Sequence, residues 1–217
     1  MNICVFGASS DIIDEKYIDA SYKLGSAMAR RGIGLVFGGG NCGVMGASAR
    51  GEFDNGGYIL GVAPTFMKIH NLLYDNCTKF KYTETMAQRK TYMEDHSDAF
   101  IIAPGGVGTF EEFFEVYALK QLGRHNKAIV IFNVGGYYDK LVDMINHAVD
   151  ENFVKNDSLE LFAVFDEIEP MIDYLENYEG VDTDMMKTRY AFLQDGEKIE
   201  EMLKDGVITS RRLFLLI

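Results

Sequence analysis

The stretch DAFIIAPGGVGTFEE, residues 98–112, decides the fold class of this chain. Residues 98–103 are almost entirely apolar, which predicts a buried strand, and residues 109–122 have the pattern of a helix. Three glycines within Pro104–Thr109 separate the two elements. A strand that leads through glycines directly into a helix is typical of the ligand-binding turns of α/β sheets.

The same succession of strand, turn and helix recurs on both sides of this stretch. Strands are expected at residues 3–6, 33–37, 58–63, 127–133 and 161–165, and helices at 15–31, 44–53, 84–95, 137–150 and 168–177. Residues 65–83 have mixed polarity and no clean period, so they receive no assignment. Near-continuous apolar strands that alternate with helices predict an α/β, Rossmann-like three-layer sandwich, with a mostly parallel sheet and helices on both faces.

The chain is expected to hold one nucleotide-binding catalytic domain, residues 1–178, because 217 residues suit a single α/β core. The regular pattern ends there, and residues 179–217 form an appendage of unknown role. This appendage finishes in the apolar run Leu213–Ile217, which we expect to pack on this subunit or on a neighbour.

Composition narrows the class of ligand. A net charge of −12 argues against a nucleic-acid polymer as partner, whereas a few oriented amides can still hold one phosphate. The three cysteines are far apart and the four histidines form no pair at helical spacing, so neither a metal nor a cofactor is expected. A basic, apolar leader and a membrane-length apolar run are both missing from the sequence, which predicts a cytoplasmic protein without membrane contact.

Two glycine-rich turns are the candidate ligand site. In a parallel sheet both lie at the carboxyl edge, where helix N-termini offer free N–H groups. We expect Gly105, Gly106, Val107, Gly108 and Thr109 to bind a phosphate, and Gly39 and Gly40 to line the facing wall. A single glycine cluster would more simply be a tight turn. Neither turn matches a Walker A loop or a GxGxxG fingerprint, which disfavours a P-loop NTPase and a dinucleotide oxidoreductase.

Charged residues beside these turns suggest chemistry. Glu111 and Glu115 share one face of the helix, whereas Glu112 is turned about 100° away and is free for a different role. Arg89 and Lys90 lie on the preceding helix, whose direction brings them towards the same edge of the sheet. An Arg-Lys pair taken alone is more often a solvated helix face.

Met86–Lys90 followed by Pro104–Glu112 resembles the LONELY GUY family of cytokinin riboside 5'-monophosphate phosphoribohydrolases, whose members are often labelled lysine decarboxylases. The resemblance covers residues 2–177 and implies that Arg89 and Glu112 are catalytic. It further implies that Gly106, Gly108 and Thr109 hold the 5'-phosphate, that Lys90 contacts the ligand, and that the protein is a homodimer.

Three features depart from the family pattern. Ala87 stands where many members have His, Ala128 replaces a frequent Pro, and Gly7–Asp11 differs from the common Cys-Gly-Ser-Ser form. These departures leave the proposed catalytic pair intact and leave the preferred base open.

The residue types fit cleavage of a base–ribose bond, which builds positive charge on the sugar. An ionised Glu112 stabilises such a cation and orients or deprotonates water, while Arg89 holds the phosphate or lowers the pKa of Glu112. The acid that protonates the leaving base stays open, with carboxyl groups of residues 65–83 or of a partner as candidates.

The predicted function is therefore hydrolysis of a nucleoside 5'-monophosphate, of cytokinin type or with plain adenine, to free base and ribose 5-phosphate. The alternative is a carrier or sensor that binds a nucleotide or a phosphorylated cofactor without catalysis. A lysine decarboxylase is disfavoured, because that reaction needs pyridoxal phosphate on a lysine and Lys90 is a weak candidate.

Overall fold

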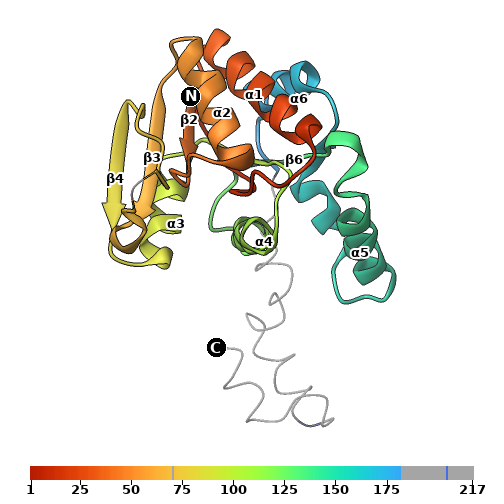
Figure 1. The fold of residues 1–217 in the computed structure, drawn as a ribbon. Coiled ribbons are helices and arrows are strands. Elements are labelled where there is room, and N and C mark those ends of the chain that lie inside the picture. The colour runs from red at the N-terminus through yellow and green to blue at the C-terminus, as the bar shows by residue number, and fades with distance from the viewer. Residues whose placement is uncertain (70, 182–203, 205–217) are drawn as a thin grey trace.

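A computed structural model of the chain describes residues 1–69, 71–181 and 204. Seven strands form one sheet in the order β4-β3-β2-β1-β5-β6-β7, and every neighbouring pair is parallel (Figure 1). The strands are β1 (Asn2–Phe6), β2 (Gly34–Phe37), β3 (Ile59–Pro64), β4 (Lys79–Thr83), β5 (Ala99–Ile102), β6 (Ala128–Phe132) and β7 (Ala163–Phe165). The predicted α/β class is confirmed, and the described sheet is parallel throughout.

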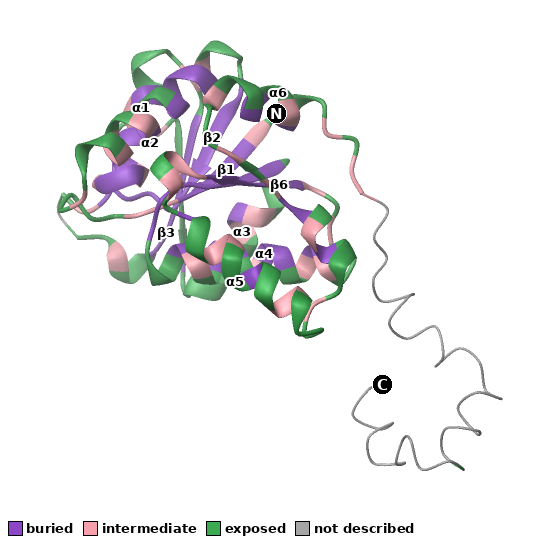
Figure 2. Cartoon of the chain, turned by 90° about the vertical axis from the view of Figure 1, so that its right-hand side faces the viewer, coloured by how far each residue is buried: buried purple, intermediate pink, exposed green. Residues whose placement is uncertain are grey.

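Two layers of helices cover the sheet, and Figure 2 shows the buried strands between them. One layer consists of α1 (Glu15–Arg30), α2 (Gly43–Asp54) and α6 (Ile168–Glu176), and the other of α3 (Met86–Asp95), α4 (Val107–Gln121) and α5 (Asp139–Asp150). Short 3-10 turns are η1 (Thr65–Met67), η2 (Val134–Gly136) and η3 (Asn156–Leu161). The three-layer sandwich is thus confirmed.

Each layer of helices has its own core, and the strands alternate between the two. In β1, Ile3 and Val5 pack with α1, α2 and α6, whereas Cys4 and Phe6 pack with α3, α4 and α5. Because both faces of the strand are buried, both sets of side chains are apolar. Burial on both faces explains why the strand sequences are continuously apolar instead of alternating.

The structure adds an edge strand that the sequence pattern did not reveal. β4 lies within residues 65–83, which received no assignment, and it pairs with β3 at the end of the sheet. Lys79, Lys81 and Tyr82 on this strand are exposed. An edge strand has little apolar surface to bury and commonly carries lysines, so its sequence lacks the signal of the inner strands.

The last predicted strand, residues 161–165, was too long at its start. Leu161 ends the 3-10 turn η3, and β7 contains Ala163–Phe165 alone. Leu161 is nevertheless fully buried, in the core beneath α4 and α5. A buried apolar residue in a turn cannot be distinguished by sequence from one in a strand, so the prediction included Leu161 in the strand.

The chain order creates a crevice at the carboxyl edge of the sheet. It runs outwards from β1 to β4 and then returns to add β5 on the other side of β1. The loops that follow β1 and β5 therefore leave towards opposite faces, and ligands of doubly wound folds bind at such a point.

Beyond α6, the described chain continues to Val181, whose N–H donates to the side-chain oxygen of Asn126 at 3.0 Å. Most of the predicted appendage, residues 179–217, lies outside the described residues, so its predicted packing stays a prediction. Among the residues that are described, no helix is both long enough and apolar enough to cross a membrane.

Candidate active site

A cavity of about 480 Å³ opens at the crevice beside β1. Its walls come from residues 7–10 after β1, from residues 38 and 40–42 before α2, and from residues 106–109, 111 and 112 at the start of α4. It is completed by Met45 of α2, Met86 and Arg89 of α3, Met67 and Leu72. The volume lies in the range of small-ligand pockets, about 300–1,000 Å³.

Most of the predicted site residues meet in this cavity. Its lining includes Gly40, Arg89, Gly106, Val107, Gly108, Thr109 and Glu112. Gly39, Gly105 and Lys90 lie outside the lining. Gly39 has a φ of +75°, and a Cβ there would come within 2.7 Å of the Phe80 ring, so the backbone and the packing both favour glycine. The two glycine-rich turns are therefore brought together, as their positions in the sequence predicted.

Arg89 and Glu112 form a buried ion pair in the lining of the cavity. Arg89 Nη1 donates to Glu112 Oε1 at 3.0 Å, and Arg89 Nε donates to the carbonyl oxygen of Val62 at 3.2 Å. The two residues are only 6% and 8% exposed. The guanidinium packs against Gly38, where a Cβ would come within 1.9 Å of Arg89 Nη2. Packing and hydrogen bonds thus hold the guanidinium in one orientation towards the carboxylate.

Burial dominates the proton affinity of Glu112. Desolvation raises the pKa of this carboxyl group to about 7, although the Arg89 guanidinium acts in the opposite direction. The sequence argument that Arg89 lowers the pKa of Glu112 gives the correct sign for that one interaction, but the net shift is upward. A carboxyl group with a pKa near 7 is suited to proton transfer at neutral pH.

The N-terminus of α4 is open to the cavity. Gly106 is its N-cap, and no side chain among the described residues caps this helix. A Cβ on Gly106 or Gly108 would meet nothing within 4 Å, so the space beside both residues is free. Exposed amides at the positive end of a helix form a ready site for an anion. This end of α4 fits a phosphate group.

The N-terminus of α2 is occupied by the chain itself. Asp11 Oδ1 accepts a hydrogen bond from the N–H of Gly43 at 2.7 Å. Hydrogen bonds from Cys42 and from the Gly43 backbone lower the pKa of Asp11, so the carboxylate is ionised at neutral pH. An internal anion therefore holds the position that a ligand phosphate would need at this turn.

Lys90 binds the two acidic residues on the other face of α4. Its Nζ forms ion pairs with Glu111 Oε1 and, at 2.6 Å, with Glu115 Oε2. The sequence argument that Glu111 and Glu115 share a face while Glu112 has a different environment is thereby confirmed. In this structure Lys90 neutralises acids that flank the proposed phosphate site.

Several residues that line the cavity were not predicted. Ser9 and Ser10 follow β1, in the loop that begins at Gly7, and the glycine at the end of a strand was the sequence signal that could have identified them. Met67 and Leu72 come from the unassigned stretch and give the lining an apolar part. The carboxyl group sought in that stretch for the leaving base is not in the described lining, whose acidic residues are Glu111 and Glu112.

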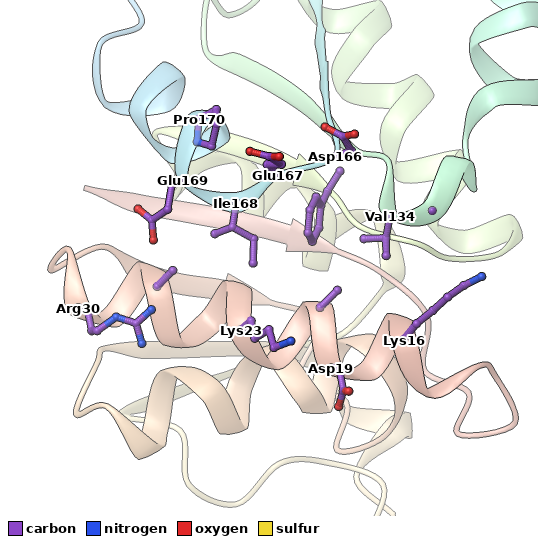
Figure 3. A pocket seen from close by; sticks show the side chains of 14 residues that line it. Lys16, Asp19, Lys23, Arg30, Val134, Asp166, Glu167, Ile168, Glu169 and Pro170 are labelled. Atoms are coloured by element: carbon purple, nitrogen blue, oxygen red, sulfur yellow. The ribbon is translucent and has the colours of Figure 1, made fainter.

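A second hollow, of about 610 Å³, lies between α1 and α6 (Figure 3). Lys16, Lys23 and Arg30 lie along its α1 side, and the three acidic residues Asp166, Glu167 and Glu169 lie opposite, at the start of α6. Acidic side chains around this helix N-terminus make it unsuitable for a phosphate. Of the N-termini of α4 and α6, only that of α4 suits a phosphate. The described residues also contain no cluster of three or more metal-ligating side chains.

A protein family described as "Possible lysine decarboxylase" matches residues 45–175. Cytokinin riboside 5'-monophosphate phosphoribohydrolase LOG3 of Arabidopsis thaliana is 38% identical over 176 residues, which are 81% of this chain and 82% of that protein. The chain belongs to the LONELY GUY family.

A second LONELY GUY relative is the probable cytokinin riboside 5'-monophosphate phosphoribohydrolase LOG6 of Arabidopsis thaliana. It is 42% identical over 153 residues, which are 70% of this chain and 76% of that protein. Among solved structures, the molybdenum cofactor carrier protein of Chlamydomonas reinhardtii superposes with a TM-score of 0.62 at 20% identity, covering 81% of this chain and 95% of the other. A likeness at that level of identity concerns the fold alone.

Proposed function

We propose that this protein hydrolyses the N-glycosidic bond of a nucleoside 5'-monophosphate and releases the free base and ribose 5-phosphate. The base is of cytokinin type or plain adenine, and the names of the LONELY GUY relatives, cytokinin riboside 5'-monophosphate phosphoribohydrolases, support the first. The observation that carries the proposal is the buried Arg89–Glu112 pair, which lies in one cavity with the open N-terminus of α4.

Phosphate binding is assigned to the amides of residues 106–108 and to the Thr109 hydroxyl. Gly106 and Gly108 carry no side chain that would keep an anion away from these amides. The phosphate anchors the substrate, and the ribose then extends along the cavity towards Glu112. Gly39, Gly40, Gly105 and Lys90 remain part of the proposed site, with Gly40 alone of these four in the lining.

Glu112 is assigned the catalytic carboxylate. As the base departs, positive charge develops on the ribose, and an ionised carboxylate nearby stabilises it. The same carboxylate orients a water molecule and accepts its proton, which a pKa of about 7 permits at neutral pH. Arg89 positions Glu112 through the hydrogen bond of 3.0 Å and favours its ionised form.

The carrier hypothesis explains less of the site. A phosphate cradle needs amides, but it does not need a carboxylate buried beside it at an energetic cost. Glu112 is such a buried carboxylate, and Arg89 forms an ion pair with it. A lysine decarboxylase would need a lysine free to bind pyridoxal phosphate, whereas Lys90 is held by Glu111 and Glu115 outside the cavity lining.

The family resemblance further predicts a homodimer, and the sequence predicts a cytoplasmic location. Size-exclusion chromatography with light scattering on the full chain tests the first of these. A mass of about 49 kDa, twice the 24.4 kDa of the chain, is the expected result, and a monomer mass would contradict it.

The decisive experiment measures base release from AMP and from isopentenyladenosine 5'-monophosphate by chromatography. Wild-type protein should release free base, and Glu112→Gln should be slower by a factor of about 10² to 10⁴. Glu111→Gln is the matched control, because it changes the neighbouring carboxylate and should keep most of the turnover. Binding without base release by the wild-type protein would favour the carrier hypothesis instead.

A further inference from the structure

Two consecutive tyrosines hold the backbone that leads into the phosphate turn. The hydroxyl of Tyr137 donates to the carbonyl oxygen of Gly105 at 2.6 Å, and the hydroxyl of Tyr138 donates to that of Ala103 at 2.7 Å. These carbonyls lie on either side of Pro104. Neither tyrosine is part of the cavity lining, and both hydroxyls bind the backbone that leads into it.

A third bond completes the set. The N–H of Ala8, in the loop after β1, donates to the carbonyl oxygen of Pro104 at 3.0 Å. Three successive carbonyls, from Ala103 to Gly105, therefore each accept a hydrogen bond from a group outside the turn. Rotating one of these peptide planes would break such a bond, and glycine offers no steric resistance to that rotation. The tyrosine hydroxyls therefore restrain a rotation of the peptide planes that the glycines alone would allow.

The tyrosines are themselves firmly placed. Gly135 and Gly136 have φ values of +59° and +74°, so a tight turn directly precedes the two tyrosines. The side-chain oxygen of Asn133 accepts a hydrogen bond from the N–H of Tyr138 at 2.7 Å. Figure 3 shows Val134, where this turn begins, beside the hollow along α1 and opposite Lys16.

Aromatic packing and burial complete this support. Tyr137 meets the ring of Tyr17 edge-on at 5.5 Å between centroids, and Tyr138 meets Phe110 of α4 at 6.3 Å. Tyr138 is only 1% exposed, and burial raises its pKa, so its hydroxyl stays a donor at all physiological pH values. Both hydroxyls are thus held where they can donate to the turn.

We propose that Tyr137 and Tyr138 are positioning residues that clamp the carbonyls of Gly105 and Ala103 respectively. The Gly105 carbonyl shares its peptide plane with the Gly106 N–H, so the clamp directs this amide at a phosphate and fixes where the chain enters α4, whose first amides are those of residues 107 and 108. With the Gly105 carbonyl engaged, the Gly106 N–H on the opposite side of the same peptide plane is already oriented, so the ligand meets no cost of ordering it. The inference rests on the proposed function in taking a sugar phosphate as the ligand of this turn, but it does not require hydrolysis.

The test measures ribose 5-phosphate affinity by calorimetry for wild type, Tyr137→Phe, Tyr138→Phe and the double variant. Tyr117→Phe is the matched control, because its hydroxyl also donates to a backbone carbonyl, that of Ser158 at 3.1 Å, from a residue that is 6% exposed. Each clamp variant should weaken binding about three- to tenfold, and Tyr117→Phe should leave it unchanged within about twofold.

A steady-state measurement with AMP separates positioning from general loss of structure. In the clamp variants KM should rise more than kcat falls, because the phosphate anchor is what weakens. Binding of adenosine, which carries no phosphate, should be the same in all variants. Wild-type affinity in both Tyr→Phe variants, or equal losses in Tyr117→Phe, would overturn the clamp. If the protein binds ribose 5-phosphate with the expected pattern but cleaves no nucleotide, the proposed hydrolysis fails while the clamp stands.

Discussion

The two glycine-rich turns of this protein look alike in sequence and differ in what occupies them. Each follows an inner strand and leads into a helix, α2 in one case and α4 in the other. At α2 the carboxylate of Asp11 accepts the hydrogen bond of the first helical amide, whereas α4 has no described side-chain cap and faces the cavity. A glycine-rich turn is thus a candidate site for a ligand anion only where no side chain of the protein already binds its amides, as Asp11 does at α2.

Each of these helices also carries a buried glutamate, and the two glutamates differ in their surroundings. Glu112 on α4 is paired with Arg89 in the cavity. Glu52, in the last turn of α2, is fully buried, and neither of its carboxyl oxygens has a hydrogen-bond partner among the described residues. Burial raises the pKa of both carboxyl groups, to about 7 and about 8 respectively. Glu112 has an ion-pair partner and faces the cavity, which makes it a candidate catalytic group. Among the described residues Glu52 has neither, and its ionisation would only destabilise the fold.

The largest effect is expected at Glu52. Since its folded-state pKa is raised from 4.5 to about 8, its contribution to stability is complete below pH 4.5 and is lost as the pH rises to about 8. The loss amounts to on the order of 5 kcal/mol, and Glu52→Gln should remove it because the amide does not ionise.

Urea unfolding of wild type and Glu52→Gln at pH 5 and pH 8.5 measures this difference. Glu151→Gln, which changes an exposed glutamate at the end of α5, is the control and should follow the wild-type pH dependence. An unchanged pH slope in Glu52→Gln would show that the buried carboxyl does not govern it.

The second largest effect is expected from a substitution that gives α4 the kind of acidic side chain found at α2. Gly108→Asp places a carboxylate at the open helix N-terminus, much as Asp11 does at α2. Because the position is exposed and a Cβ there meets no atom within 4 Å, the variant should fold. Its KM for AMP should rise on the order of 100-fold, because a fixed negative charge competes with the phosphate.

Gly108→Asn has nearly the same shape without the charge, and it should raise KM by less than about tenfold. Equal effects of Asp and Asn would mean that the side chain's volume matters and its charge does not. That outcome would contradict the assignment of phosphate to α4.

The third effect concerns the pH dependence of turnover. If Glu112 acts in its ionised form, kcat/KM for AMP should rise about tenfold per pH unit up to about pH 7 and then level off. In Glu111→Gln this limb should move to lower pH, because the negative charge of Glu111 contributes to the raised pKa of Glu112. A limb that moves upward in this variant would contradict the assignment.

The smallest effect is expected from Asp11→Ala. It frees the first amide of α2, which weakens the helix start and should lower Tm by roughly 3 °C, with little change in kcat/KM. Differential scanning calorimetry gives the first quantity and AMP turnover the second. A loss of turnover as large as that of Glu112→Gln would place the phosphate at α2 and reverse the comparison.

Much of the fold was predictable because inner strands and amphipathic helices carry local patterns. Residues 98–112 predicted a strand, a turn and a helix, and the structure contains β5, the turn and α4 there. β4 was missed because exposed residues such as Lys79 and Lys81 remove that pattern from an edge strand. The separate environment of Glu112 was predictable from helical spacing, as its ion pair with Arg89 and that of Glu111 with Lys90 demonstrate.

The sequence by itself determined the alternation of strands and helices, the two glycine-rich turns and the family, because these depend on residues within a few positions of one another or on a short motif. Only the tertiary structure decided which turn is filled by Asp11, which carboxylate meets Arg89, and which tyrosines hold Ala103 and Gly105. Each of these contacts joins residues more than 20 positions apart, through the order in which the strands assemble, and no local pattern encodes that order.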